Sequence, residues 1–335
     1  MNKQEEGAYM RLRIGKVNNN LKYTIVVPTY NEENDIEETI KHLIKIDYEN
    51  YDVIIVDDSN DNTPNIIRKY ESDNLRLIIP EVRSGRSEAR NIGIKASNCD
   101  VVIILNADVH LPPNFINEID VHYKNGYDAV SVYSQVKNID NIYARYIELD
   151  FLNKHHKGFY RKLKQELKYF WTEGFSVKKD LLMKTTLFPS NSVVPIVAGE
   201  DVRLMDELRK YNCKGIYDEN IIIEHIAPST FKEFWHIRVG RGEGTPQVRR
   251  FIDKWSFKKI AFIATLKLMK RLLMFIFLIP LFIKGYELAR HSNKNRFLET
   301  FAMTFIYGLE QIAFSYGEFK SFFNVYNKTK DVKGK

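Results

Sequence analysis

Short apolar runs alternate with amphipathic stretches over the first hundred or so residues. Each run is rich in β-branched residues and has polar ends, which is typical of a strand buried on both faces of a parallel sheet. The stretches between them show the apolar spacing of helices and have polar starts. We therefore predict a βαβαβαβ unit. The predicted strands are 23–28, 53–57, 75–79 and 101–105, and the predicted helices are 32–46, 63–71 and 87–96.

Less regular elements follow. Residues 129–136, 174–177 and 221–226 are predicted strands, and a helix is predicted over 201–211. Residues 141–170 form a long basic stretch with interleaved aromatic residues. Its pattern indicates an amphipathic helix packed on the sheet, with a lipid or acceptor surface as the alternative.

The last hundred or so residues are strongly apolar. Lys267, Lys270 and Arg271 interrupt the stretch 260–283, and glutamates interrupt the stretch 297–319, so neither is a clean transmembrane segment. Basic residues flank both stretches. This pattern predicts two helices that lie among lipid headgroups or form a shallow hairpin in the bilayer. The alternative is a helical pair packed on the α/β domain or on a second subunit.

The net charge of +7 is unevenly distributed. Residues 1–226 carry 30 Lys and Arg against 35 Asp and Glu, whereas residues 227–335 carry 20 against 8. A basic and apolar C-terminal part favours anionic lipid over nucleic acid as its partner. Cys99 and Cys213 lack the spacing of a disulfide framework or zinc site, and residues 1–22 lack the apolar core of a secretory signal peptide. We therefore expect a reducing, cytoplasmic setting.

Polar clusters follow the predicted strands, at the sheet edge where α/β folds bind ligands. The first cluster contains Thr29 and Glu32. The second places Asp57, Asp58 and Asp61 in one short turn, where their repulsion favours a bound cation, ribose or base edge. Helix capping is the alternative for both clusters.

Two further clusters point to phosphate and metal. Arg83, Arg86 and Arg90 surround a predicted helix start, where unpaired backbone N–H groups and guanidinium groups both favour a diphosphate. The alternative is a solvated basic surface. The next strand ends in Asn106-Ala107-Asp108, and this carboxylate is a candidate ligand for Mg²⁺ or Mn²⁺.

The second half of the chain supplies candidate catalytic groups. Glu200 and Asp201 begin a predicted helix, where one carboxylate can remove a proton from an acceptor hydroxyl; capping is the alternative. His225 follows a strand and is a candidate metal ligand, although a lone histidine is more often structural. The glycine-rich segment 236–244, with Arg238 and Arg241, predicts a mobile loop that closes over a charged leaving group.

Taken in order, these motifs resemble those of family 2 glycosyltransferases with the GT-A fold, over residues 22–244. The resemblance implies an α/β fold with a Rossmann-like, mostly parallel sheet flanked by helices, followed here by the C-terminal hydrophobic helical region. It also implies a nucleotide site. The implied nucleotide-binding residues are Pro28, Thr29, Glu32, Asp57, Asp58, Arg86, Arg90 and Asn106.

The resemblance also implies a base and a metal site. The base of inverting family members corresponds to Asp201, with Glu200 beside it. Asp108 and His225 would hold Mg²⁺ or Mn²⁺. The family's Asp-x-Asp motif reads Asn-Ala-Asp here, so the loss of one carboxylate at Asn106 is expected to weaken metal binding.

Two segments correspond to regions that contact substrate in the family. By resemblance, Gly174 and Phe175 line the sugar and acceptor pocket. Arg238 and Arg241 belong to a lid that neutralises the departing diphosphate.

These expectations divide the chain into four parts: an N-terminal extension over 1–21, a GT-A domain over 22–250, membrane-associated helices over 251–322 and a polar tail over 323–335. The expected activity is sugar transfer from a nucleotide diphosphate to a lipid-linked or glycan acceptor at the cytoplasmic face of the cell membrane. The expected partners are nucleotide sugar, acceptor and membrane lipid, not nucleic acid. A sugar nucleotidyltransferase and a catalytically silent membrane-associated scaffold with the same fold are the alternatives.

Overall fold

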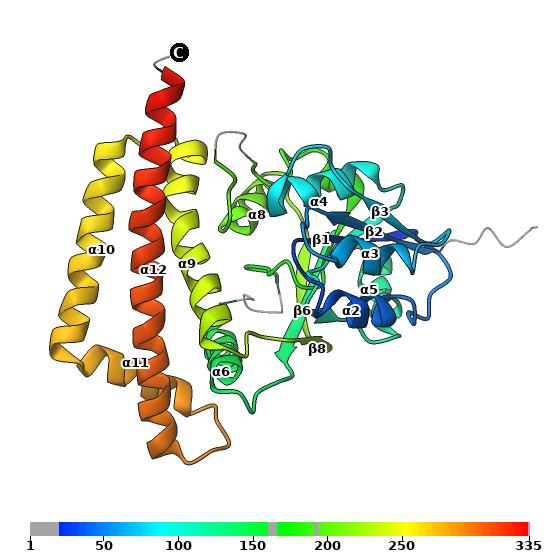
Figure 1. Cartoon of the computed structure of the whole chain (residues 1–335). Helices are drawn as coiled ribbons and strands as arrows, with labels where there is room; N and C mark the ends of the chain where they lie inside the picture. The colour runs from blue at the N-terminus through cyan, green and yellow to red at the C-terminus, as the bar shows by residue number, and fades with distance from the viewer. Residues whose placement is uncertain (1–19, 160–165, 191–193, 334–335) are drawn as a thin grey trace, which may run out of the picture.

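A computed structural model of the chain describes residues 20–159, 166–190 and 194–333 (Figure 1). Its centre is a sheet of eight strands in the order β3-β2-β1-β4-β7-β6-β8-β5. The strands are β1 (Tyr23–Thr29), β2 (Tyr51–Asp57), β3 (Leu75–Ile78), β4 (Val101–Ile104), β5 (Val109–His110), β6 (Ala129–Val136), β7 (Phe175–Lys178) and β8 (Gly215–His225).

The first four strands confirm the predicted parallel unit, since β1 pairs in parallel with both β2 and β4, and β2 with β3. The other half of the sheet is mixed. Strand β7 runs antiparallel to both β4 and β6, and β5 runs antiparallel to β8. Strand β6 pairs with β8 in parallel, so the sheet is mostly parallel, as predicted, but it also contains the antiparallel strands β7 and β5. The apolar pattern could not show this, because a strand buried on both faces has the same composition in either direction.

Helices cover both faces of the sheet and enclose two apolar cores. On one face, Ile40 of α2 (Ile36–Leu43) and Phe115 of α5 (Phe115–Lys124) pack with Val27. On the other, Ile94 of α4 (Gly85–Ala96) and Leu204 of α8 (Glu200–Lys210) are buried in the second core. The short helices α3 (Thr63–Arg68) and α7 (Lys179–Leu182) complete this domain.

The predicted helix over 141–170 is shorter than expected. Helix α6 (Ile142–His156) begins at Asn141, whose side chain accepts hydrogen bonds from two backbone N–H groups, and residues 166–170 are not helical. Tyr146 and Phe151 pack in a core with residues of the C-terminal helices. The aromatic side chains of α6 thus join the α/β domain to the helical part of the protein.

Four helices form a layer beside the α/β domain (Figure 1). They are α9 (Phe231–Gln247), which runs into the π-helical segment η2 (Val248–Ile252), α10 (Phe257–Phe277), α11 (Ile279–Ala289) and α12 (Arg296–Lys333). The predicted apolar stretch 260–283 is divided at Leu278, which has a φ of 56° and precedes Pro280. Across the described residues, the helices lack the combination of length and apolar composition that membrane crossing requires.

The prediction of a mobile loop over 236–244 is wrong, because these residues lie within α9. The glycines allow α9 and α12 to approach closely. A Cβ atom on Gly242 would lie 2.2 Å from the carbonyl oxygen of Phe314, and one on Gly317 would lie 2.1 Å from that of Val239. The glycine run therefore reflects backbone-to-backbone packing rather than flexibility.

Candidate active site

The ends of β1 and β2 are tied together by side chains at the sheet's carboxyl edge. Thr29 Oγ1 and Ser59 Oγ each donate to Oδ1 of the buried Asp57, both at 2.6 Å. Pro28, one residue earlier on β1, pairs with Val56 of β2. Asp57 is thus held rigidly by its neighbours, and Thr29 lies beside it as predicted.

The Asp58 carboxylate contacts the backbone at the start of α4. Its Oδ2 accepts hydrogen bonds from the backbone N–H groups of Ser84 at 3.0 Å and Gly85 at 2.6 Å. The carboxylate therefore occupies the N-terminal end of α4, where the sequence predicted phosphate. Arg86, one residue further, is exposed and forms no ion pair within the part of the chain that the structure describes.

Arg90 is fully buried, so its predicted contact with phosphate is not what the structure shows. Its Nη1 donates to Glu200 at 2.8 Å, and its Nη2 donates to Asn106 at 3.0 Å and Thr172 at 2.8 Å. These contacts connect α4, the loop after β4, the segment before β7 and α8. They also explain Asn106, whose amide oxygen faces Arg90.

The two adjacent carboxylates at the start of α8 have opposite pKa shifts. Burial raises the pKa of Glu200, but the Arg90 guanidinium outweighs it and holds that pKa below its usual range. Burial and the charge of Glu200 raise the pKa of Asp201 to about 6. The hydroxyl of Tyr169 donates to Asp201. Glu200 is thereby fixed as an anion, whereas Asp201 can exchange a proton near neutral pH.

Asp108 and His225 lie together where the loop after β4 meets the end of β8. His225 Nε2 is 3.4 Å from Asp108 Oδ2, and its Nδ1 is 3.6 Å from Glu173 Oε2. Burial lowers the pKa of His225, but the carboxylates of Glu173 and Asp108 raise it to about 9. The buried Oδ1 of Asp108 has no hydrogen-bond partner among the described residues.

Further charges surround this pair. Burial, together with the charges of Asp108 and Asp35, raises the pKa of Glu32 to about 7. Arg241 on α9 lies 5.6 Å from the ring of Trp171, measured from its guanidinium carbon, and burial lowers its pKa. In the described residues no three His, Cys, Asp or Glu side chains are grouped closely enough to hold a metal ion.

Two predicted contacts with substrate are wrong. Arg238 is buried, with Nε 3.0 Å from Glu310 of α12, so it joins helices and is not part of a lid. The Phe175 ring is fully buried and stacks on Phe170 with ring centres 3.7 Å apart, so it belongs to the core. Gly174 has a φ of 71°, and its N–H donates to Ile104, which sets the turn into β7.

Sequence reasoning missed three residues of the segment before β7. Tyr169 contacts Asp201, Thr172 contacts Arg90, and Glu173 lies beside His225. All three are polar residues within a few positions of Gly174, whose role had been predicted. Tyr169 lies in the stretch 141–170, which the sequence predicts to be one helix, and no local pattern marks Thr172 or Glu173.

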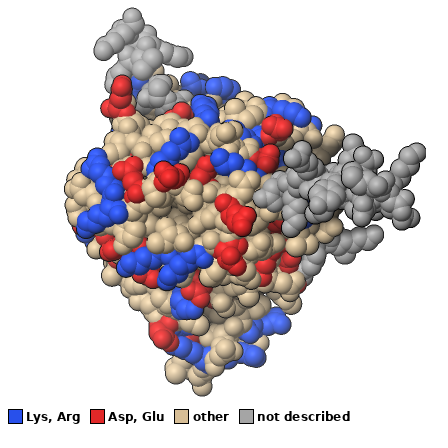
Figure 2. Space-filling view, turned by 90° about the vertical axis from the view of Figure 1, so that its right-hand side faces the viewer, with Lys and Arg blue, Asp and Glu red and all other residues tan. Residues whose placement is uncertain are grey.

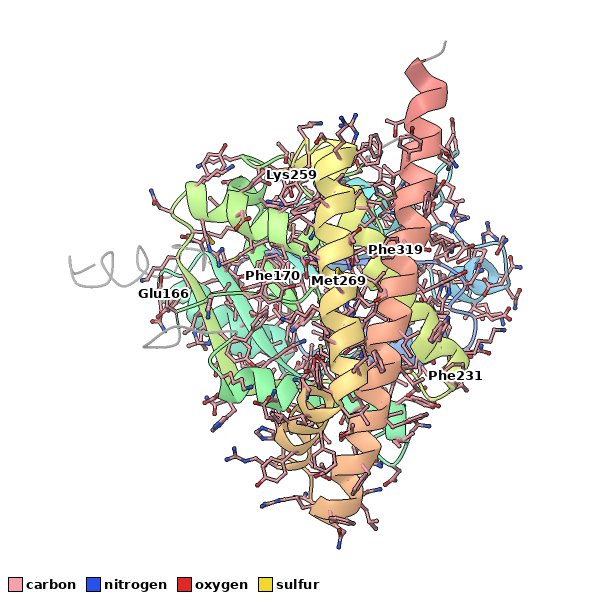
Figure 3. The ribbon with its side chains drawn as sticks, turned by 90° about the vertical axis from the view of Figure 1, so that its left-hand side faces the viewer. Glu166, Phe170, Phe231, Lys259, Met269 and Phe319 are labelled. Carbon is pink, nitrogen blue, oxygen red and sulfur yellow. The ribbon has the colours of Figure 1, made fainter. Side chains whose placement is uncertain are left out.

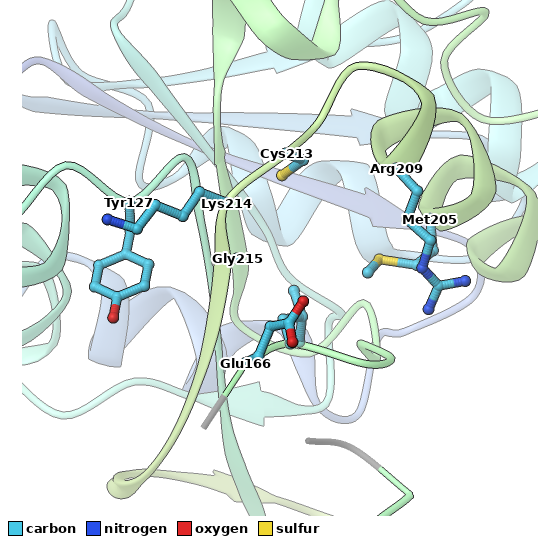
Figure 4. A pocket seen from close by; sticks show the side chains of 8 residues that line it. Tyr127, Glu166, Met205, Arg209, Cys213, Lys214 and Gly215 are labelled. Atoms are coloured by element: carbon cyan, nitrogen blue, oxygen red, sulfur yellow. The ribbon is translucent and has the colours of Figure 1, made fainter. Parts of the chain in front are cut away.

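A separate hollow of about 310 Å³ lies near the start of β8, at the opposite end of the strand from His225 (Figure 4). Lys214 and Gly215 line it together with Arg209 and Met205 of α8 and Tyr127. It contains none of the groups described above. The groups around Asp201 and Asp108 therefore form the candidate site.

Comparison with known proteins finds glycosyltransferases among the relatives of the chain. Residues 24–186 match the model of glycosyl transferase family 2. The chain is 23% identical to the poly-beta-1,6-N-acetyl-D-glucosamine synthase of Staphylococcus epidermidis over 304 residues, which cover 84% of this chain and 71% of the synthase. It is 33% identical to the undecaprenyl-phosphate 4-deoxy-4-formamido-L-arabinose transferase of Proteus mirabilis over 117 residues, 32% of this chain and 36% of that protein.

Among solved structures, a mannosyltransferase from Pyrobaculum calidifontis in complex with GDP-Man and Mn²⁺ is similar to the chain with a TM-score of 0.59 and 21% identity. The similarity covers 90% of this chain and 87% of the mannosyltransferase. It shows the fold, which is the α/β GT-A fold with a curled mixed sheet flanked by helices.

Proposed function

Because the chain is a glycosyltransferase of family 2, we propose that it moves a sugar from a nucleotide diphosphate to a hydroxyl of a lipid-linked or glycan acceptor, with inversion at the anomeric carbon. Asp201 is the general base. The observation that carries this assignment is the difference between two neighbouring carboxylates: Arg90 keeps Glu200 ionised, and the pKa of Asp201 is raised to about 6. A base with a pKa near the working pH combines a large ionised fraction with a strong tendency to take a proton.

The reaction is a single displacement. Asp201 accepts the proton of the acceptor hydroxyl as that oxygen forms a bond to the anomeric carbon, and the bond from this carbon to the diphosphate oxygen breaks. Tyr169 donates to Asp201 and orients the carboxylate. Arg90 does not touch substrate but fixes Glu200 and therefore the start of α8.

The nucleotide lies at the carboxyl edge of β1 and β2 in this proposal. Pro28, Thr29, Glu32, Asp57 and Asp58 surround its base and ribose. Arg86 and Arg241 are the cations available to the departing diphosphate, because neither forms an ion pair in the described residues. A fixed positive charge at the leaving group stabilises the charge that develops in the transition state.

The residues present fit a divalent cation only in part. The unpartnered buried oxygen of Asp108 is a suitable ligand, and His225 becomes one when its ring loses a proton. These are only two groups, so donor phosphates would have to complete the shell. Asp108 and His225 would hold Mg²⁺ or Mn²⁺ here. A bound cation would supply charge neutralisation at the diphosphate.

We place the reaction at the cytoplasmic face of the cell membrane. Support comes from the basic, apolar C-terminal helices and from relatives whose names specify an undecaprenyl-phosphate substrate or a polymeric glycan product.

The test is a screen of nucleotide sugars with full-length protein, with and without Mn²⁺, first for donor hydrolysis and then with soluble glycans and polyprenyl phosphates as acceptors. Release of nucleoside diphosphate that depends on Asp201 supports the proposal. Release of pyrophosphate from a nucleoside triphosphate and a sugar phosphate would indicate a nucleotidyltransferase. A correctly folded protein that binds no nucleotide would indicate a silent scaffold.

A further inference from the structure

The outer surface of the helical layer carries two parallel rows of exposed apolar side chains. In α10 they follow one helix face at alternating intervals of four and three residues, from Phe262 to Ile276, which are 63% and 70% exposed. A second row runs along α12 from Phe297 to Phe323. We define the outer face by Phe262, Leu266, Met269, Leu273, Ile276, Phe297, Phe301, Phe305, Ile312, Tyr316 and Phe323.

This face points away from the α/β domain. Helix α12 packs against α9 through the glycine contacts, so its apolar row lies on the side that α9 does not cover. Figure 3 views the protein from that side and shows α10 and α12 in front, with Lys259 and Met269 on α10. An exposed apolar surface that extends along two long helices is unusual for a soluble monomer and marks a contact surface.

The apolar tip of the layer is formed where α10 meets α11. Leu278 turns the chain, and Phe277, Ile279 and Ile283 are each more than half exposed beside it. The outer face and this tip are continuous along the chain, because the row on α10 leads directly into the turn. The contact surface therefore has both a flat part and a projecting apolar corner.

The charges around the outer face are nearly all positive. Residues 254–298 contain ten Lys and Arg and a single acid, Glu287. Among the described side chains of this region, Lys258, Lys270, Arg290, Lys294 and Arg296 have no ion-pair partner. These cations remain available to an external anionic partner.

The acids of the same helices whose side chains the structure describes form ion pairs within the protein. Glu287 pairs with Lys157 at 2.7 Å, Glu299 with Arg145 at 2.6 Å, and Glu310 with Arg238 at 3.0 Å. Glu318 is buried between Arg249 at 3.4 Å and Arg271 at 3.2 Å. Among the side chains that the structure describes, the outer face thus presents apolar groups and cations without exposed, unpaired acids.

The opposite end of the protein differs. Figure 2 shows the surface of the α/β domain with acidic and basic side chains mixed, and neither sign predominates. A partner that recognised charge alone would gain little on that face, whereas the helical layer suits a partner that is both anionic and apolar.

We propose that the outer face docks on one leaflet of an anionic phospholipid bilayer, with α10 and α12 lying in the plane of the interface. The apolar rows and the corner at Leu278 enter the boundary between headgroups and acyl chains, and the unpaired lysines and arginines contact lipid phosphates. A second copy of the chain is the less favoured occupant, because two such faces would bring unpaired cations together. The inference rests on the proposed function only for the nature of the acceptor, since docking requires neither donor nor turnover.

The experiment measures flotation of the full-length protein with vesicles of phosphatidylcholine alone or mixed with phosphatidylglycerol, without any sugar donor. We expect binding to the anionic vesicles that weakens at high salt. Changing Lys258 and Lys270 to Gln should weaken it by about fivefold for each residue. The double variant Leu273→Asp with Ile276→Asp should lose at least about tenfold in binding, because charges enter the bilayer poorly.

The matched control is Ile44→Asp with Val121→Asp, which adds the same charges at apolar side chains of the α/β domain that are 51% and 55% exposed. It should bind vesicles like the parent. Circular dichroism and the Tm establish that each variant is folded. Equal binding by both double variants would overturn the proposal. So would a parent protein that ignores anionic vesicles and forms a dimer that Leu273→Asp with Ile276→Asp dissociates, since that result assigns the face to a second copy.

Discussion

Arg90 and Glu200 form a buried ion pair, with Nη1 of the arginine 2.8 Å from Oε1 of the glutamate. This contact separates the roles of two adjacent acids. Glu200 is held as an anion by its partner, and its charge raises the pKa of Asp201. The sequence shows only a Glu-Asp pair at a helix start, so this division of roles depends on Arg90, 110 residues earlier in the chain.

The first prediction concerns the base. Asp201→Asn should lower kcat by at least about 100-fold, because general base catalysis contributes on this order, while the Kd for nucleoside diphosphate changes little. Turnover and isothermal titration on the same preparation measure the two effects. A variant that transfers sugar at the parent rate would remove Asp201 from the mechanism.

The second prediction concerns pH. If ionised Asp201 is the base, kcat/KM should rise as pH increases through about 6. The free energy of unfolding should change in the opposite direction. Because the pKa of Asp201 is raised in the folded state, its carboxyl favours folding below about pH 4, and this contribution is lost as the pH rises through about 6. Asp201→Asn should therefore gain on the order of 2 kcal/mol over the parent at pH 8 and nothing at pH 4. Thermal melts of both proteins at the two pH values measure this difference. A gain of equal size at both pH values would contradict the raised pKa of Asp201.

The third prediction compares two arginines of α4. Arg90→Met leaves Glu200 buried without its partner, and breaking such a pair costs on the order of 3–5 kcal/mol. Arg86 lies on the same helix but is exposed, so Arg86→Met should leave the Tm nearly unchanged and weaken binding of nucleoside diphosphate. Denaturant unfolding and titration calorimetry give the two measurements. A stable Arg90→Met variant with weakened nucleotide binding, together with an unstable Arg86→Met variant, would contradict the roles proposed for these residues.

The fourth prediction concerns the cation. Asp108→Asn should reduce the effect of Mn²⁺ on nucleoside diphosphate binding, because it removes a carboxylate that is paired with His225 and has an unpartnered buried oxygen among the described residues. Binding without metal should change less. Titrations with Mn²⁺ and with a chelator measure nucleoside diphosphate binding with and without the metal. An undiminished Mn²⁺ effect in the variant would place any cation elsewhere.

Much of the fold could be predicted from the sequence because its signals are local. Strand β6 has the predicted bounds, and α4 and α8 begin within two residues of the predicted starts. The antiparallel direction of β7 could not be predicted, because it depends on the end of the sheet at which this strand begins. The sequence indicated Asp108, Asp201 and His225 as candidate site residues, but it did not indicate the burial of Arg90 or Arg238, which depends on partners distant in sequence.

The glycines of α9 show the same limit in another form. A glycine-rich segment beside two arginines is typical of a mobile loop, and nothing within residues 236–244 themselves indicates a helix packed against α12. The capping box of Thr230 and Glu233 was the available signal, since it marks a helix start at the head of this segment.

The last prediction tests the packing of α9 against α12 with two glycines of α12. A Cβ at Gly317 would lie 2.1 Å from the backbone oxygen of Val239 on α9, whereas the nearest atom to one at Gly308 is 3.4 Å away, on the Phe275 ring. Gly317→Ala should therefore cost at least about 1–3 kcal/mol. Gly308→Ala should be neutral or gain up to about 1 kcal/mol from helix propensity.

Activity should follow the same order, because α9 also supports the segment before the base. The side-chain oxygen of Gln247 accepts from the N–H of Val197 at 3.0 Å, and Gly244 packs against the Ala198 backbone, two residues before Glu200. Separating α9 from α12 would shift this support, so Gly317→Ala should lower kcat while Gly308→Ala keeps the parent value. Measuring Tm and kcat on both variants tests this prediction. Equal Tm values would show that α9 and α12 can separate without loss of stability.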